Sequence, residues 1–131
     1  MRGRRPTVPG PALAFALAIT MAIVPTVAAR AARPGDAEQG RVVYQTCLGC
    51  HSVDEDDVGP RHRGVIGRRA GSVPGYAYSP SLRSSGIVWD ADLLDRWLRN
   101  PQALVPGSRM FFALSDEQAR ADVIAYLATL R

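Results

Sequence analysis

Three stretches of the chain carry apolar residues at helical spacing, separated by polar positions, and each predicts a helix. The first runs from Asp36 to about Thr46. Asp36 is a suitable N-cap, and Gln39, three residues further on, completes a variant of the capping box. The apolar positions of this stretch are Val43, Tyr44 and Cys47.

The second predicted helix begins with Asp90 as its cap and ends at Asn100-Pro101, because a residue that precedes proline disfavours the helical conformation. The third follows a turn at Pro106-Gly107, with Ser115 as its cap and Gln118 at the matching position. Both carry one apolar face, which predicts burial of that face. The apolar positions are Leu93, Leu94, Trp97 and Leu98 in the second helix, and Val123, Ile124, Leu127 and Leu130 in the third.

The segment from Val58 to Trp89 is rich in glycine and proline, and its apolar residues show no sustained helical or strand periodicity. An irregular stretch of about 30 residues is uncommon inside a compact domain unless it encloses something. No alternating strand pattern occurs elsewhere in the chain. We therefore predict an all-α fold, in which a few helices and long loops wrap a large prosthetic group.

Residues 1–29 are typical of a secretory signal peptide. Arg2, Arg4 and Arg5 precede an apolar run over 12–24, which is shorter than the roughly 20 apolar residues that span a bilayer. Val27-Ala28-Ala29 offers a cleavage site. We expect export to the periplasm, removal of residues 1–29 and one remaining domain, 30–131, without stable membrane insertion. The alternative is an uncleaved signal that tethers this domain to the inner membrane.

The expected mature part is almost neutral, although the whole chain has a formal net charge of +4. Three of the 16 basic residues lie in the signal, so 13 arginines face 12 acidic residues from Arg30 onward, and the chain contains no lysine. This balance excludes nucleic acid as a default partner, since binding to a polyanion needs a basic face.

The sequence Cys47-Leu48-Gly49-Cys50-His51 is the attachment signature for haem c, an iron-containing group. Two thiols three residues apart on one helical turn can each add to a haem vinyl group, and the next residue then lies under the iron. Imidazole is a good iron ligand, so the motif predicts covalent haem with His51 bound to iron.

Three other interpretations of the cysteine pair are possible. A thioredoxin-like redox motif needs an alternation of strands and helices, which this chain does not show, and a structural disulfide leaves the long loop without a core. A zinc site needs two further ligands, for which only His62 and carboxylates are present.

The sixth position of the iron has few candidate ligands. Met110 is the only methionine after residue 29, and His62 is the only histidine besides His51. Met110 follows a turn that directs its side chain inward, whereas His62 lies two residues past Pro60, on the His51 side. We expect Met110 to be the ligand, with His62 or an open position as alternatives.

From Gly35 to Leu130 the sequence resembles soluble class I cytochromes c of the mitochondrial and alphaproteobacterial type. Beyond the haem motif and Met110, the shared residues are Gly35-Asp36, Gly40, Tyr44, Gly59-Pro60, Gly64, Gly67-Arg68, Gly71, Pro74-Gly75-Tyr76, Tyr78, Trp89, Asn100-Pro101, Pro106-Gly107 and the run 121–127. The resemblance implies the class I cytochrome c fold, in which the first and last helices cross at Gly40 with Tyr44 and Tyr126 nearby.

The resemblance also implies roles for four side chains or backbone groups around the haem. The Pro60 carbonyl accepts a hydrogen bond from His51 and so orients the imidazole. Arg68, Tyr78 and Trp89 lie near the haem propionates.

The implied function is one-electron transfer by a soluble carrier, not catalysis by an enzyme. Its partners are a redox-protein donor and acceptor, such as a cytochrome complex, an oxidase or a dehydrogenase, and we expect a monomer. The alternatives are a ligand-binding or peroxidatic haem protein, and a subunit bound permanently to a dehydrogenase or oxidase.

The chain departs from the family pattern at several positions. The loop Asp54-Glu55-Asp56-Asp57 is acidic and short, and the lysine ring around the haem edge is largely missing. We expect Leu82 and Trp97, which replace an asparagine and a tyrosine, to remove polar groups near Met110. The remaining departures are His62, in place of an apolar residue, and the arginines left at the ring, Arg96, Arg99 and Arg109.

Overall fold

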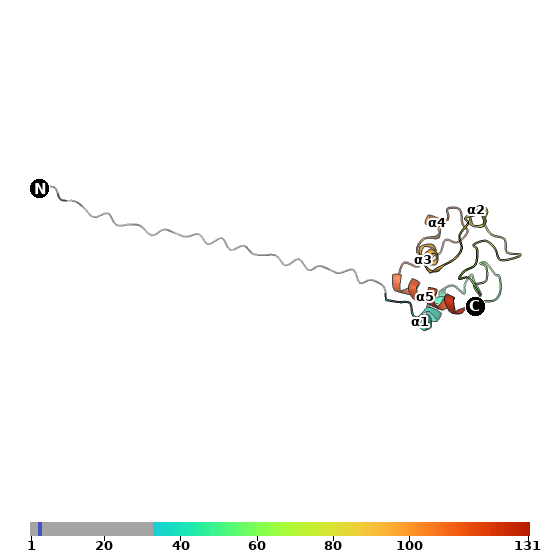
Figure 1. The fold of residues 1–131 in the computed structure, drawn as a ribbon, viewed down its shortest axis with the longest axis horizontal. Helices are drawn as coiled ribbons and strands as arrows, with labels where there is room; N and C mark the ends of the chain where they lie inside the picture. Colours follow the sequence, from blue (N-terminus) through green and yellow to red (C-terminus); the bar gives the residue numbers. More distant parts are fainter. Residues whose placement is uncertain (1–2, 4–32) are drawn as a thin grey trace.

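The computed structural model describes Gly3 and residues 33–131, so the expected signal peptide and its cleavage site fall outside the described part, Gly3 excepted. The elements follow in the order α1 (Ala37–Val43), η1 (Tyr44–Thr46), α2 (Pro80–Ser84), α3 (Ala91–Arg99), α4 (Pro101–Leu104) and α5 (Glu117–Thr129) (Figure 1). Over 33–131 the chain forms no strand, and one isolated bridge joins Arg69 to Val88. The predicted all-α fold with long loops is confirmed.

The N-terminus of α1 is tied to α5 rather than closed by its own capping box. The Asp36 carboxylate accepts hydrogen bonds from the backbone amides of Glu38 and Gln39, at 2.8 and 3.2 Å. The Asp36 amide donates to the Asp122 carboxylate on α5 at 2.8 Å. The expected return bond from Gln39 is therefore wrong, because Asp122 already accepts from this amide.

The caps of the later helices agree with the sequence in one case and differ in another. Asp90 caps α3 as predicted, accepting from the Leu93 amide at 2.7 Å. The cap of α5 is Asp116, which accepts from the Ala119 amide at 2.6 Å, and not Ser115. A carboxylate is favoured at this position because it also interacts with the positive end of the helix dipole.

Two short helices, α2 and α4, are not predicted by the apolar pattern. Each begins with proline at its first position, where no amide hydrogen is needed. Ser79 caps α2 and Asn100 caps α4. Asn100-Pro101 thus ends α3, as predicted, and also begins a new helix.

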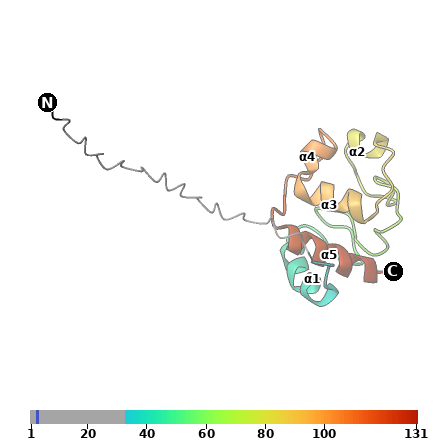
Figure 2. The same cartoon turned by 60° about the vertical axis from the view of Figure 1, so that its left-hand side comes forward.

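The helices α1 and α5 cross in close contact beside each other (Figure 2). A Cβ atom at Gly40 would lie 1.9 Å from the Asp122 carbonyl oxygen, and one at Gly35 would lie 2.1 Å from the Ala121 carbonyl oxygen. The rings of Tyr44 and Tyr126 are 5.2 Å apart. The predicted close approach at Gly40 is confirmed, and glycine is required there because backbone fills the space.

The core packs α3 and α5 against the loop that carries Trp89. The rings of Trp89 and Trp97 are 5.3 Å apart. Arg120, only 3% exposed, links the two helices through an ion pair with Asp95 at 2.7 Å. The other buried apolar residues of this core are Tyr44, Val65, Ala70, Leu94, Leu98, Val105, Val123, Ile124 and Leu127.

We predict that Gly40→Ala destabilises the protein by at least about 2 kcal/mol, because overpacking against a backbone carbonyl forces the two helices apart. Gly49→Ala is the matched control, since a Cβ atom at Gly49 meets no other atom within 4 Å. Denaturant unfolding of the haem-bound protein measures both variants. Equal free energies of unfolding for Gly40→Ala and the unchanged protein would contradict the role given to this crossing.

Candidate haem-binding site

A cavity of about 260 Å³ lies between the Cys47–His51 segment, α3, α5 and the loops. Most of its walls are apolar or aromatic, as a haem macrocycle requires. In the described residues it is lined by Thr46, Cys47, Cys50, His51, Val58, Gly59, Pro60, His62, Val65, Arg68, Arg69, Tyr76, Ala77, Tyr78, Ser79, Leu82, Trp89, Leu94, Trp97, Leu98, Arg109, Met110, Phe111, Phe112, Val123 and Leu127. All eight predicted site residues are among them.

The two cysteines lie on one helical turn at the wall of this cavity. The amides of Cys50 and His51 both donate to the Cys47 carbonyl, at 3.0 and 2.9 Å, which places both thiols and the imidazole on the same side. Both thiols are free of disulfide bonds. Burial raises the pKa of the Cys47 thiol.

The zinc alternative has no support in the structure. Across residues 33–131, no group of three or more histidine, cysteine, aspartate or glutamate side chains is arranged to hold a metal ion. The cysteine pair is therefore available for covalent attachment of a group that fills the cavity.

His51 is oriented by the backbone of the Gly59-Pro60 turn. Its Nδ1 lies 2.7 Å from the Pro60 carbonyl oxygen, and only a protonated Nδ1 can donate to that oxygen. Burial lowers the pKa of His51, which keeps the ring neutral and leaves Nε2 as a free acceptor. A Cβ atom at Gly59 would lie 2.2 Å from the imidazole, so glycine is needed to let the backbone approach the ring.

His62 lies directly against His51 and not across the cavity from it. The two rings are stacked, with centroids 4.1 Å apart and planes inclined by 22°. The His62 Nδ1 is 3.0 Å from the buried Tyr44 hydroxyl. Burial, followed by the charges of His51 and Arg68, lowers the pKa of His62 to about 3, so the ring is neutral. The sequence places His62 on the His51 side, and the structure agrees.

Met110 reaches the cavity from the loop between α4 and α5, and Trp97 on α3 donates a hydrogen bond to it. The Trp97 Nε1 lies 3.1 Å from the Met110 Sδ. The expectation that Trp97 removes a polar group from the surroundings of Met110 is therefore wrong, because the indole N–H supplies a donor. The sulfur has a second lone pair that remains available to a metal.

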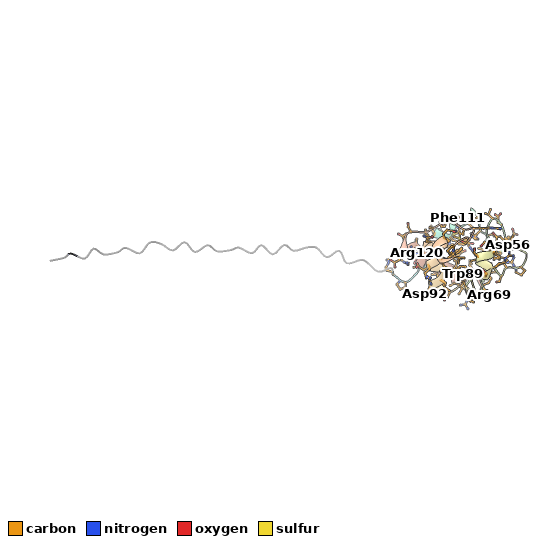
Figure 3. The ribbon with its side chains drawn as sticks, turned by 90° about the horizontal axis from the view of Figure 1, so that it is seen from above. Asp56, Arg69, Trp89, Asp92, Phe111 and Arg120 are labelled. Carbon is orange, nitrogen blue, oxygen red and sulfur yellow. The ribbon has the colours of Figure 1, made fainter. Side chains whose placement is uncertain are left out.

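Arg68, Tyr78 and Trp89, which the resemblance assigns to the haem propionates, are among the residues that line the cavity. The Arg68 guanidinium donates to the carbonyls of Arg63 and Arg61, at 3.0 and 2.7 Å. Burial raises the pKa of the Tyr78 hydroxyl. Trp89 is buried and lies toward the middle of the molecule, whereas the exposed Phe111 lies nearer its edge (Figure 3).

Comparison with known proteins agrees with this geometry. The family described as cytochrome c matches residues 37–131. The cytochrome c2 of Rhodomicrobium vannielii is 46% identical over 99 residues, which cover 72% of this chain and 79% of the relative. The cytochrome c of Euglena viridis is 43% identical over 101 residues, 74% of this chain and 99% of the relative.

Comparison with solved structures also finds cytochromes of this type. Cytochrome cH from Methylobacterium extorquens superposes with a TM-score of 0.70 at 42% identity, covering 72% of this chain and 99% of the other. The ferricytochrome c2 from Rhodopseudomonas palustris also gives a TM-score of 0.70, at 39% identity, covering 73% of this chain and 99% of the other.

Fold and site together define a haem-binding electron-transfer protein and not an enzyme. Its cofactor is a single haem c, attached through Cys47 and Cys50. The chain belongs to the cytochrome c family and has the class I fold.

Proposed function

We propose that His51 and Met110 are the two axial ligands of the haem iron. The observation that carries this proposal is the pair of hydrogen bonds that orient them. Nδ1 of His51 donates to Pro60, so Nε2 is the atom left for iron. Sδ of Met110 accepts from Trp97 and keeps one lone pair. Both side chains line the same cavity.

With both side chains bound to the iron, no position would remain for a substrate, and the haem would serve only to accept and donate one electron. The bound haem supplies a one-electron ferric–ferrous couple, whose potential the methionine sulfur raises. The surrounding apolar residues exclude water from the cavity. The rigid hydrogen bonds of His51 and Met110 hold the ligands in the same place in both oxidation states.

Arg68, Tyr78 and Trp89 are the side chains that we assign to the haem propionates. All three line the cavity, and the Trp89 amide donates to the Arg68 carbonyl at 3.0 Å. Arg68 keeps its positive charge while its guanidinium is held by two backbone carbonyls, so it is suited to face an ionised carboxylate without losing its position.

We further propose that the protein is a periplasmic carrier between a donor and an acceptor redox protein. Relatives named cytochrome c2 support a carrier of this kind, and the signal-like residues 1–29 support export. The near-neutral charge of the part after residue 29 favours docking through apolar contact more than through charge.

The ligand assignment is tested with Met110→Ala and with His62→Ala as the matched control. We expect the unchanged ferric protein to show the weak methionine–iron absorption band at the red end of the visible spectrum, and its ferrous spectrum to be unaffected by carbon monoxide. Met110→Ala should lose the band and bind carbon monoxide, while His62→Ala keeps the behaviour of the unchanged protein. If instead the unchanged protein lacks the band, and His62→Ala but not Met110→Ala gains carbon monoxide binding, the sixth position belongs to His62.

The bond from Trp97 to Met110 predicts a change in reduction potential. A donor on the sulfur withdraws electron density from the iron ligand and disfavours the ferric state. Trp97→Phe removes a hydrogen bond of about 1 kcal/mol and should lower the midpoint potential by roughly 40 mV. Redox titration measures this shift in a variant whose methionine–iron band is intact. An unchanged or higher midpoint would show that the indole N–H does not act on the sulfur.

The acidic loop predicts poor and weakly salt-dependent reaction with a mitochondrial-type oxidase, because such partners select basic surfaces. Asp57 is exposed and precedes Val58, which lies at the cavity mouth. Asp57→Lys should therefore raise the turnover rate at low ionic strength more than the control Asp92→Lys, which makes the same charge change on α3. Equal rates for the two variants, or a steep fall with salt in the unchanged protein, would contradict the prediction.

A further inference from the structure

The segment that carries Met110 is an irregular loop between α4 and α5, and one side chain spans its tightest part. Gly107 adopts a φ of 83° in this turn, and Ser108 is only 3% exposed. Gln102, on α4, bonds to three of the four residues from Gly107 to Met110. No apolar contact or motif in the sequence marks Gln102 as part of the site.

Both the nitrogen and the oxygen of the Gln102 side-chain amide form hydrogen bonds with the turn. Its Nε2 lies 2.9 Å from the Ser108 carbonyl oxygen, 2.9 Å from the Ser108 hydroxyl and 2.9 Å from the Met110 carbonyl oxygen. Its Oε1 accepts from the Gly107 amide at 3.2 Å. One side chain therefore satisfies backbone groups on both sides of the turn, up to the residue that faces the haem cavity.

Other contacts hold different parts of the same loop. Trp97 holds the Met110 side chain, and Arg109 donates to the Ala77 carbonyl at 2.7 Å across the cavity mouth. The end of the loop nearer to α5 is fixed by the Leu114 amide, which donates to the Leu98 carbonyl of α3 at 2.7 Å. Gln102 is the side chain that fixes the backbone of the turn itself.

We infer that Gln102 is a positioning residue that keeps Met110 on the iron by holding the 107–110 turn closed, and that it thereby limits access of external ligands to the iron. This inference rests on the proposed ligation by Met110. An external ligand such as imidazole binds only when Met110 has left, so its apparent affinity is reduced by the fraction of molecules with an open loop. Weakening the turn raises that fraction and the apparent affinity together.

The expected change is about tenfold in affinity, the upper end of what loss of one net hydrogen bond produces. Gln102→Ala removes all of the bonds. Gln102→Glu keeps the shape of the side chain and the acceptor for Gly107, but it brings a carboxylate without hydrogens against the carbonyl oxygens of Ser108 and Met110. We therefore expect the glutamate variant to weaken the turn at least as strongly as the alanine variant.

The experiment is an imidazole titration of the ferric, haem-bound protein, followed through loss of the methionine–iron absorption band. Gln39→Ala, on the exposed side of α1, is the matched control and should bind imidazole as the unchanged protein does. Both Gln102 variants should bind imidazole about tenfold more tightly and displace Met110 faster. Global unfolding by denaturant, measured in parallel, separates local opening from a general loss of stability.

Unchanged imidazole affinity in both Gln102 variants overturns the inference, whether or not their global stability falls. A failure of the proposed ligation gives a different result. In that case the unchanged protein has no methionine–iron band, and Met110→Ala binds imidazole with the affinity of the unchanged protein before Gln102 is altered at all.

Discussion

The contact of α1 with α5 at Gly40 is the constraint on which the site depends. The backbone of α1 lies so close to the Asp122 carbonyl that no side chain fits between them. Because α1 runs through η1 directly into Cys47, this contact fixes where the covalent attachment begins. The same helix α5 provides Val123 and Leu127 to the cavity wall, so one helix crossing sets the distance between the attachment segment and the opposite wall. The long loops then need only to close the remaining sides.

Much of the site can be predicted from the sequence, because the haem motif depends on local spacing and the chain contains few side chains that could bind iron. The haem motif is local, whereas the orientation of His51 by Pro60, nine residues further on, is predicted only by the family resemblance. Met110 is predicted because few other ligands exist in the chain. The caps Asp36 and Asp90 are likewise local features, and both are confirmed.

The site features that sequence misses need a tertiary approach, whereas the missed helices are local features. The bond from Trp97 to Met110 joins residues 13 positions apart, from a helix to a loop, and a tryptophan on an apolar face is indistinguishable from ordinary core. Gln102 has no apolar partner that would single it out. The short helices α2 and α4 are invisible to periodicity because they are too short to repeat, and their prolines resemble loop residues.

If Met110 binds the iron as proposed, the described residues 33–131 offer no evident replacement for it once the loop opens. In cytochromes c that this chain resembles, a lysine amine takes the place of methionine at high pH, but this chain has no lysine. Arginine stays protonated and cannot bind a metal. His62 is stacked on His51 and hydrogen-bonded to Tyr44, so it lies on the same side of the cavity as His51. Among the described residues, an opened loop is thus left to solvent or an external ligand. Under the proposed ligation, the contacts that keep the loop closed are therefore what limits reactions of external ligands at the iron.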